Sequence, residues 1–534
     1  MTWNINDPQG GEADKIKYEI VQYTRGKGVD LGCGPTKAFP HFIGVDSCKD
    51  TELFNIEIKP DVVCDDATQL DFVDDGTLDF VFSSHLLEHI PDTRAALTEW
   101  WKKLKVGGHL VLYLPHKALY PNIGTPGANP DHKHDFTEAD IYDHMAEVGG
   151  FDLLVQEVRD QGREYSFLQV FRKRDDALQL VMLEERPPKS ACVVRYGGFG
   201  DSIQAANLLP ELKRQGYHIT FMTTPGGQEI LKHDPHIDAW LLQDHDQVPN
   251  HELVLYWAVQ QKKFDKFIQL SESVEGTLLA FPGRTNHAWP QSVRRAVMGK
   301  NYLEWTAALA EVEYTSEARF YPSPDETAKA RTYLADFKNQ LAGPLRMMER
   351  APDRFNILWC LAGSSIHKFY PWQDDVIANI LQAMPEAVII FSGDMACKIL
   401  EAGWEEEPRI RCTSGEMGIR DTLTLAQNVD CVVGPETGVL NAVAFEPVGK
   451  VIFLSHSSPE NLTKHWVNTT TMTPANTPCY PCHRLHYGAE FCHEDPGTGA
   501  ALCQKDIAPE LVFHAIGRQY DDWKALRSLF KEIA

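Results

Sequence analysis

Short apolar runs alternate with amphipathic or polar stretches along most of the chain. In residues 1–175 the runs GVDLGCG, FIGVD, LDFVFSS and HLVLYLP are candidate strands, and helix-patterned or loop stretches separate them. Such an alternation predicts a parallel sheet covered by helices. Two later runs, LLVQEVRD and EYSFLQVFRKR, predict an antiparallel pair that closes this sheet.

Two further blocks with the same alternation follow. The first, residues 190–345, opens with ACVVRYGGFGDS, and the second, residues 346–534, contains FNILWCLAGSS, AVIIFSGD and CVVGPETG. A charged stretch with a Pro-Pro pair, residues 176–189, is a predicted linker in front of them. Each block begins with a strand and a glycine-containing turn, so we expect two Rossmann-like halves that face one cleft. The predicted fold class is therefore α/β throughout.

Composition narrows the classes of function. The chain has 534 residues, enough for three or four domains at roughly 150 residues each. Its 75 acidic and 51 basic side chains give a formal net charge of −24, so a broad basic surface for nucleic acid is not expected. No apolar run reaches the roughly 18 residues of a membrane span, and the first residues lack a signal-peptide pattern. We therefore expect a cytoplasmic protein.

The stretch GVDLGCGPTKAFPHFIGVD predicts a cofactor site. Its first strand ends at Asp30, and Gly32 and Gly34 let the backbone turn tightly against a ligand. The second strand ends at Asp46, whose carboxylate can accept both hydroxyls of a ribose. A dinucleotide motif needs a third glycine and an acid about 20 residues downstream. This chain has no third glycine and a closer acid, which suits S-adenosylmethionine (SAM), a cofactor without phosphate.

The rest of the first block supports SAM. CDDATQLDF follows a third strand, LDFVFSSHLLEHI is a strand leading into a helix, and WWKKLKVGGHLVLYLPH is a helix, a glycine turn and a strand. Over about residues 20–175 this order resembles the class I SAM-dependent methyltransferases. The resemblance implies that Asp30, Gly32 and Gly34 cradle the methionine part, that Asp46 holds the ribose, that Asp66 and Ala67 lie at the adenine, and that Ser83 lies near the sulfonium.

Methyl transfer to oxygen benefits from a general base. Four histidines are candidates for that base: His85, His89, His132 and His134. The first two are spaced i, i+4 and can share one helix face. The last two lie in the loop NPDHKHDFTEAD, and similar histidine-containing loops occur in methyltransferases associated with surface polysaccharides. A structural histidine, buried or solvated, is the alternative for each.

Three stretches in the later blocks carry a second candidate site. In CVVRYGGFGDS a strand runs into a glycine-rich turn that ends at Asp201, for which simple helix capping is the alternative. LAGSSIHKFYPW offers amides, hydroxyls and an ammonium for a pyrophosphate. CVVGPETGVLNAVAF turns into a helix whose first amides can face a phosphate. The donor-binding candidates are Gly363, Ser364, Ser365, Lys368, Glu436, Thr437 and Gly438.

The order of these stretches resembles glycosyltransferase family 9, the ADP-heptosyltransferase group with the GT-B fold, over about residues 190–520. The resemblance implies inverting sugar transfer, with Asp201 as the base, Lys368, Thr437 and Gly438 on the diphosphate, and Glu436 on the donor sugar. The family usually has Asp where this chain has Glu436, and its turn is richer in charge than GSSIHKF. ADP-heptose is the expected donor by analogy.

The combined prediction is a bifunctional glycosyltransferase and SAM-dependent methyltransferase. It would use a nucleotide sugar, and its acceptor would be a glycan, a lipopolysaccharide-type molecule or a protein. Two alternatives stay open: one module serves only for binding or scaffolding, or the acceptor is a nucleic-acid base. A homo-oligomer is also compatible with the sequence.

Four of the twelve cysteines cluster near the C-terminus, and the other eight are scattered and read as buried thiols of a reducing compartment. The four are Cys479, Cys482, Cys492 and Cys503, spaced C-x2-C-x9-C-x10-C. Two thiolates in C-x2-C can reach one ion, and the segment has no long apolar run of its own, so a structural metal would organise it. Alternatives to the fourth ligand are His483, His486 and His493. This predicted finger, residues 479–503, resembles the four-cysteine iron finger of some protein heptosyltransferases. A structural site of four sulfur ligands would bind zinc equally well, so the ion stays open between zinc and iron.

Overall fold

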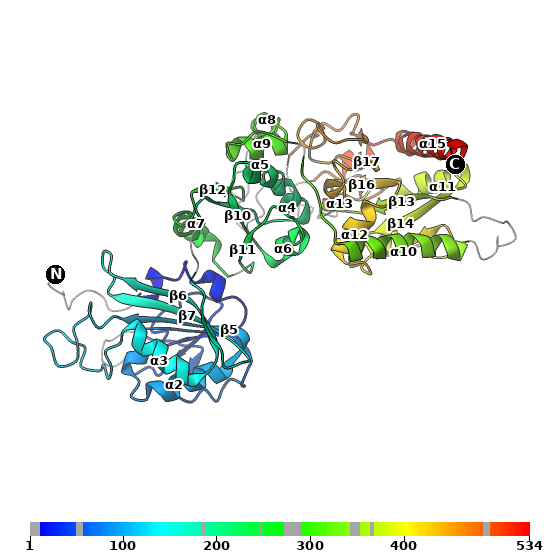
Figure 1. Cartoon of the computed structure of the whole chain (residues 1–534). Coiled ribbons are helices and arrows are strands. Elements are labelled where there is room, and N and C mark those ends of the chain that lie inside the picture. Colours follow the sequence, from blue (N-terminus) through cyan, green and yellow to red (C-terminus); the bar gives the residue numbers. More distant parts are fainter. Residues whose placement is uncertain are drawn as a thin grey trace. The chain divides into compact units, whose positions relative to one another are not determined.

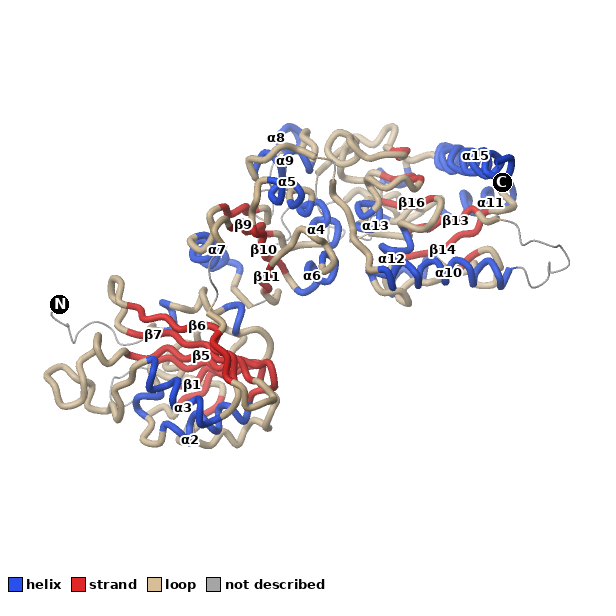
Figure 2. The backbone as a smooth tube through the Cα atoms, viewed as in Figure 1, coloured by secondary structure: helices blue, strands red, loops and turns tan. Residues whose placement is uncertain are grey.

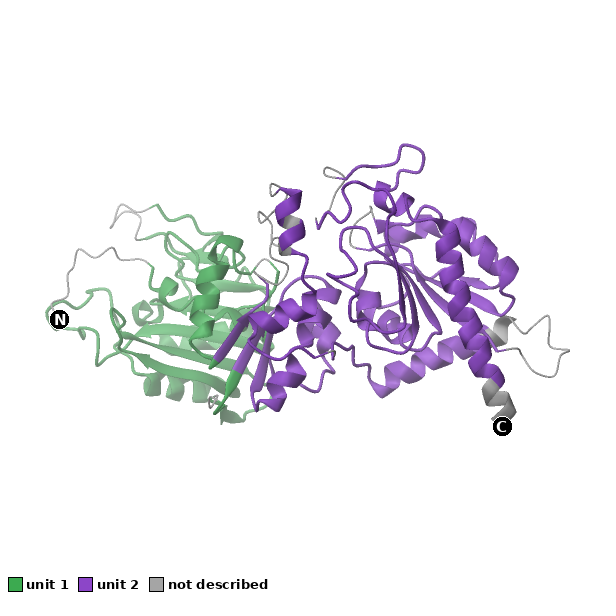
Figure 3. Ribbon diagram, turned by 90° about the horizontal axis from the view of Figure 1, so that it is seen from above, with its two compact units in different colours: residues 1–190, 241–265 green, residues 191–240, 266–534 purple. Residues whose placement is uncertain are grey.

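The computed structural model describes residues 11–49, 57–183, 187–245, 247–271, 290–315, 317–341, 353–363, 368–483 and 492–533. The chain divides into two compact units (Figures 1 and 3). The first holds residues 1–190 and 241–265, and the second holds residues 191–240 and 266–534.

The first unit is built on one eight-stranded sheet (Figure 2). Its strand order is β3-β2-β1-β4-β5-β7-β6-β8. The strands are β1 Gly28–Leu31, β2 Ile43–Asp46, β3 Val62–Val63, β4 Leu78–Ser84, β5 Leu104–Pro115, β6 Phe151–Arg159, β7 Ser166–Lys173 and β8 Gln179–Val181. Strands β1 to β5 pair in parallel, and β7 runs antiparallel to both β5 and β6. The predicted parallel sheet and its closing antiparallel pair are confirmed.

Helices complete the first unit. They are η1 Ala13–Lys15, η2 Val21–Tyr23, η3 Leu87–His89, α2 Thr93–Lys103, α3 Glu138–Val148, η4 Asn250–Glu252 and α7 Leu253–Gln261. Helices α2 and α3 lie side by side (Figure 1), and both pack apolar side chains into one core with the sheet. Asp92 starts α2 by accepting the N–H of Ala95 at 2.9 Å, and Thr137 with Asp140 forms a capping box at α3.

The segment 241–265 belongs to this unit through contacts with the N-terminal residues. The Gln260 amide donates to the carbonyl of Tyr18 at 2.7 Å, and the Tyr18 hydroxyl donates to Glu252 at 2.9 Å. The Gln247 amide, which is buried, donates to the carbonyl of Thr24 at 3.1 Å. Polar side chains thus dock η4 and α7 on the first 25 residues, a grouping that the residue pattern did not indicate.

The second unit contains two parallel α/β halves. One sheet has the order β11-β10-β9-β12, and the other has the order β15-β14-β13-β16-β17-β18. The first sheet comprises β9 Ser190–Val194, β10 His218–Thr223, β11 Ala239–Leu242 and β12 Lys266–Gln269. The second comprises β13 Phe355–Cys360, β14 Ala387–Ser392, β15 Ile410–Arg411, β16 Cys431–Pro435, β17 Gly449–Phe453 and β18 Thr469–Met472. Every neighbouring pair in the six-stranded sheet is parallel, as predicted for the two later blocks.

Helices join these two halves. They are α4 Phe199–Ala206, α5 Leu209–Arg214, α6 Pro225–Leu231, α8 Gln291–Val297, α9 Tyr302–Leu309, α10 Pro324–Leu341, α11 Gln373–Ala383, η6 Met395–Leu400, α12 Ile419–Ala426, α13 Gly438–Ala442, α14 Leu502–Lys505 and α15 Pro509–Ile533. The buried Arg420 of α12 binds Glu326 of α10 and donates to the carbonyl of Ile230 of α6 at 2.7 Å. One apolar core also runs through both halves. Across the described stretches, no helix is long and apolar enough to cross a membrane.

Candidate functional site

The glycine turn after β1 is tied to the acid that ends β2. Gly32 and Gly34 both have positive φ, +72° and +57°, which favours glycine. The N–H of Gly34 donates to Oδ2 of Asp46 at 3.0 Å. A Cβ on Gly32 would lie 3.0 Å from Leu86, whereas a Cβ on Gly34 would meet nothing within 4 Å. The turn therefore packs against the chain after β4 on one side and is open at Gly34.

Both predicted acids also shape this turn. Asp30 is buried and accepts the N–H of Ala38 at 2.9 Å. Burial raises the pKa of Asp30 to about 7, although that hydrogen bond acts in the opposite direction. Asp46 is half-buried, and its Oδ1 accepts the N–H of Cys48 at 2.8 Å. The two carboxylates thus fix the backbone on which a cofactor would rest.

The remaining SAM candidates follow β3 or lie near the end of β4. Asp66 is exposed and accepts hydrogen bonds from the Thr68 N–H at 2.9 Å and hydroxyl at 2.6 Å. Ala67 offers its carbonyl to the Trp100 indole N–H at 2.8 Å. Ser83 in β4 is fully buried, and its hydroxyl has no hydrogen-bond partner among the described residues. No contact in this structure tests their predicted roles toward SAM.

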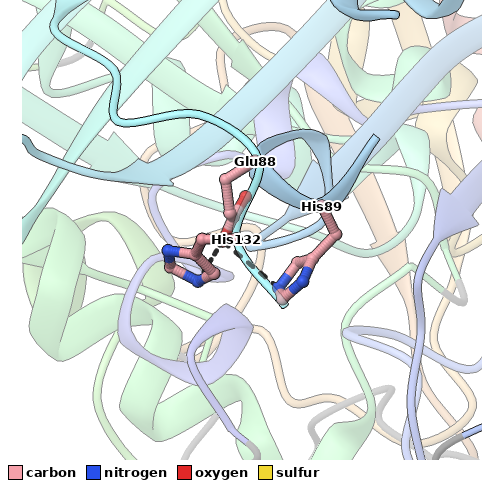
Figure 4. Close-up of side chains that lie close together, drawn as sticks. All are labelled: Glu88, His89 and His132. Carbon is pink, nitrogen blue, oxygen red and sulfur yellow. Dashed lines mark ion pairs between the residues drawn. The ribbon is translucent and has the colours of Figure 1, made fainter. Parts of the chain in front are cut away.

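Three of the four candidate histidines gather around a buried glutamate. Oε1 of Glu88 lies 3.8 Å from Nδ1 of His85, 4.0 Å from Nε2 of His89 and 4.0 Å from Nε2 of His132. Figure 4 shows the Glu88 carboxylate between the rings of His89 and His132. His134 does not join the cluster, because its Nε2 lies 3.1 Å from the carbonyl of Pro91.

Main-chain hydrogen bonds bring the distant loop to this cluster. The carbonyl of Glu88 accepts the N–H groups of Lys133 at 2.8 Å and His134 at 3.2 Å. His132 directly precedes these two donors in the sequence. Its buried ring stacks on the ring of Tyr120, with a distance of 5.3 Å between the ring centroids. The loop predicted to supply a base is therefore held against η3, and it places His132 beside Glu88.

Burial sets the protonation of the cluster. It lowers the pKa of His85 to about 3 and that of His132 to about 4, and it raises the pKa of Glu88 to about 8. The two imidazoles are therefore neutral near pH 7. Glu88 is not among the predicted site residues, because a glutamate inside HLLEHI is typical of an exposed position on a helix.

Asp201, the predicted base of the second site, is the third residue of α4. Its Oδ2 accepts the N–H of Gly198 at 2.9 Å, and its Oδ1 lies 2.9 Å from Nη2 of the buried Arg195. The first contact is a capping-box contact from the third residue of the helix to its N-cap, Gly198, so Asp201 supports the helix start without being the N-cap of the alternative interpretation. The second places a cation beside the carboxylate, so both oxygens of Asp201 are engaged within the chain.

The predicted donor-binding residues come together after β13 and β16. A Cβ on Gly363 would lie 2.7 Å from Cδ of Lys368 and 3.1 Å from the carbonyl oxygen of Glu436. The buried Lys368 ammonium donates to that same carbonyl at 3.1 Å, and the Thr437 hydroxyl accepts the N–H of Leu440 at 3.4 Å. A Cβ on Gly438 would meet Gly200 of α4 at 3.0 Å. Ser364 and Ser365 lie outside the described residues.

The Glu436 side chain is bound inside the protein. It accepts the N–H groups of Ser455 at 2.8 Å and Ser457 at 3.1 Å, and it lies 2.5 Å from Nδ1 of His456. Burial acts to raise its pKa, but His456 and Lys368 outweigh burial and hold that pKa at about 2. The carboxylate is thus an anion that stabilises the loop after β17.

The four clustered cysteines occupy a segment anchored by α8. Arg295 donates to the carbonyl of Tyr480 at 2.8 Å, and Gln291 donates to the carbonyl of Cys479 at 2.9 Å. Burial and then the neighbouring thiols raise the pKa of Cys492 to about 11, and the same causes raise that of the buried Cys503.

The geometry of a metal finger is not assembled here. Of the described residues, the only three potential ligands whose atoms lie within 4.8 Å of one another are Glu88, His89 and His132. His483 is buried and His493 is exposed, whereas His486 lies outside the described residues. The four-cysteine site therefore stays a prediction.

A family model matches part of the first unit. Residues 29–112, which run from β1 into β5, match a family model described as a methyltransferase domain. This match confirms the methyltransferase interpretation of the first block and covers the glycine turn, both strand-end acids and the Glu88 segment. No curated protein matches the chain.

Solved structures resemble parts of the chain at low identity. A glycosyl transferase family 9 structure from Veillonella parvula DSM 2008 is 12% identical, with a TM-score of 0.46, over 64% of this chain and 99% of that chain. The E. coli ADP-heptose LPS heptosyltransferase II is 15% identical, with a TM-score of 0.42, over 63% and 100%. A putative methyltransferase from Bacillus halodurans C-125 is 17% identical, with a TM-score of 0.23, over 31% and 100%.

Proposed function

We propose that this chain is a bifunctional transferase that methylates, and adds a sugar to, a glycan or a glycosylated protein. The observation that carries the first activity is the hydrogen bond between Gly34 and Asp46 inside a matched methyltransferase domain. It joins the turn that would hold the methionine part of SAM to the acid that would hold its ribose. Residues 1–175 are the proposed methyltransferase domain, and 190–345 with 346–534 are the proposed acceptor and donor halves of the glycosyltransferase.

The methyl acceptor is proposed to be a hydroxyl of the sugar or glycan. Methyl transfer needs the acceptor to lose a proton, and the candidates to accept it are His85, His89 and His132. The half-exposed His89 is the strongest of these, because burial lowers the pKa of the other two and so weakens them as bases. His134 is the weaker candidate, because its ring is engaged with the carbonyl of Pro91.

The second unit is proposed to transfer a heptose-like sugar from a nucleotide diphosphate with inversion. An inverting displacement needs one base opposite the leaving group, and we assign that role to Asp201. The leaving diphosphate needs a cation in a turn with little side-chain bulk. The support for this assignment is Lys368, a buried ammonium next to Gly363 and Thr437. Glu436 would act through the loop it holds.

A screen of cofactor and donor binding tests both halves of the proposal. Calorimetry should give saturable heat with SAM and, independently, with one member of a panel of nucleotide diphosphate sugars. Mass spectrometry of small molecules released from the purified protein gives the same answer without a chosen ligand. Absence of SAM heat would exclude the methyltransferase activity, and heat with SAM alone would leave the second unit as the scaffolding module.

A further inference from the structure

Glu88 is a fully buried carboxyl group in the first unit. Neither of its side-chain oxygens has a hydrogen-bond partner among the described residues. Burying such a group unpaired costs free energy, so an unsatisfied one calls for an explanation such as a bound ion or water. The nitrogens around Oε1 lie at 3.8–4.0 Å, which is too far for hydrogen bonds.

Those spacings fit an ion between the side chains. The ligand atoms of Glu88, His89 and His132 all lie within 4.8 Å of one another. In a tetrahedral site with bonds of about 2.0–2.2 Å, ligand atoms are about 3.3 Å apart or slightly more, so each pair of ligand atoms needs to close by at most about 1.5 Å. We propose that Glu88, His89 and His132 form a binding site for a divalent transition-metal ion.

The protein backbone prepares this site. Glu88 and His89 follow directly after β4 in η3, and the Glu88 carbonyl binds the loop that carries His132. Figure 4 shows His89 and His132 approaching the carboxylate from its two sides. The His89 side chain is 31% exposed, so the remaining coordination positions of the ion face solvent. Three protein ligands and an open face are typical of an ion that also binds water or a substrate oxygen.

His85 has a different place in the cluster. Its Nδ1 lies 3.8 Å from Glu88, but its Nε2 lies 2.9 Å from the hydroxyl of Ser166. It is outside the group of three mutually close ligands. We therefore assign His85 to the support of Glu88 and not to the ion.

The donor set selects the class of ion. Two imidazoles and one carboxylate suit Zn²⁺, Fe²⁺, Mn²⁺ or Co²⁺, whereas Mg²⁺ and Ca²⁺ prefer ligands that are all oxygen. The site also lies close to the cofactor turn, because Leu86 packs against Gly32. A role in activating the acceptor oxygen would rest on the proposed methyl transfer, but metal binding does not.

Cobalt titration of the metal-free full chain tests the site without any assay of activity. Co²⁺ bound by nitrogen and oxygen absorbs in the visible region, whereas cobalt bound by cysteines adds an intense near-ultraviolet thiolate band. In the wild type, one Co²⁺ ion per chain should bind with absorption in the visible region and without an accompanying thiolate band. Glu88→Gln and His89→Asn should each weaken that binding roughly ten-fold or more.

A matched control distinguishes the loss of a metal ligand from the general effect of removing a histidine that lies beside a carboxylate. His116 lies 3.1 Å from Glu138 in an isolated pair, so His116→Gln should leave the cobalt affinity unchanged. Thermal unfolding of each variant checks the fold, and His89→Asn is the variant least able to disturb it because His89 is half-exposed. Equal cobalt affinity in the wild type, Glu88→Gln and His89→Asn would overturn the proposal, as would no binding to the wild type at micromolar free cobalt.

Discussion

The guanidinium of Arg195 lies 2.9 Å from Oδ1 of Asp201, the carboxylate proposed to activate the sugar acceptor. Arg195 is almost fully buried, so its guanidinium is shielded from solvent and held in one position beside the carboxylate. The other oxygen of Asp201 accepts the N–H of Gly198. The pair fixes the orientation of the carboxylate, and a base in such a position works only on a hydroxyl delivered to its exposed edge.

Asp201→Asn should lower the turnover of glycosyl transfer by roughly 10² to 10⁴ while leaving donor affinity nearly unchanged. The amide keeps the size and one acceptor oxygen but cannot take the proton. Initial rates with saturating donor, together with donor titration by calorimetry, measure both effects.

Asp421→Asn is the matched control for this change. Asp421 is also the third residue of its helix after a glycine cap, and it pairs with Lys329 at 2.6 Å. If Asp201 only stabilises its helix, both variants will lose a little stability and keep full turnover, and the assignment of the base will have failed.

Gly363→Ala should weaken binding of the nucleotide sugar. The added Cβ would lie 2.7 Å from Cδ of Lys368 and 3.1 Å from a backbone oxygen, so the lysine has to move out of its buried place. Overpacking of this kind costs roughly 1–3 kcal/mol, which corresponds to an increase of about 5-fold to 150-fold in donor Kd if the ammonium binds the diphosphate.

Gly226→Ala serves as the comparison, since its Cβ would meet no atom nearer than 3.8 Å. Donor titrations of the two variants side by side give the result. An unchanged donor Kd in Gly363→Ala would show that Lys368 does not bind the donor.

Asp46→Asn should reduce SAM affinity. The carboxylate holds the Gly34 and Cys48 amides and would also hold the ribose, and loss of a charged hydrogen-bond acceptor costs roughly 1.5–3 kcal/mol. Calorimetry with SAM should therefore show a Kd more than about ten-fold higher.

Asp61→Asn is a suitable control, because Asp61 accepts the N–H of Gly44 at 2.8 Å and binds Lys37, whereas Asp46 accepts the N–H of Gly34. Similar SAM affinities in both variants would show that Asp46 has no special place in the cofactor site.

The sequence was informative where local patterns decide the structure. The first strand ends at Leu31, one residue after the predicted Asp30, and the second ends at Asp46 as predicted. These ends and the positive φ of Gly32 and Gly34 follow from apolar runs and glycine spacing. The same holds for the parallel strands of the later blocks, which are buried on both faces and read as unbroken apolar runs.

Long-range contacts could not be read in the same way. Glu88 is buried only because a loop more than forty residues further along folds over it, with His132 in place. Glu436 follows a family pattern, yet its environment depends on amides that arrive after the next strand, at Ser455 and Ser457. Which polar side chains turn inward is decided by such tertiary contacts, which one-dimensional periodicity does not record.

The first unit should lose stability in acid partly through His109 in β5. Burial, and then the charge of Arg172 on the neighbouring strand, lowers the pKa of this histidine from 6.5 to about 4. Between pH 6.5 and pH 4, His109 is protonated in the unfolded chain but stays neutral in the folded chain. The contribution of His109 to the free energy of unfolding is therefore fully present above pH 6.5. It falls by about 3 kcal/mol as the pH drops toward 4.

His109→Gln removes this proton and should flatten that part of the stability curve. Urea unfolding of the two proteins at several pH values between 6.5 and 4 measures the difference, with His251→Gln, a change at an exposed ring, as the control. Parallel curves for the wild type and His109→Gln would show that other groups account for the acid sensitivity.

The last prediction concerns Cys479, Cys482, Cys492 and Cys503. Protein purified without chelator should contain about one zinc or iron ion that depends on these thiols, because C-x2-C with two further cysteines supplies a closed four-sulfur set. The sequence between them has no long apolar run, so the metal would supply the folding energy of this segment. Cys479→Ser with Cys482→Ser should abolish that ion in elemental analysis. It should also lower the unfolding temperature of the second unit, because Arg295 and Gln291 of α8 bind the carbonyls of this segment. Cys397→Ser with Cys412→Ser, outside the segment, should leave the metal content unchanged. A metal-free wild type with full activity would refute the finger.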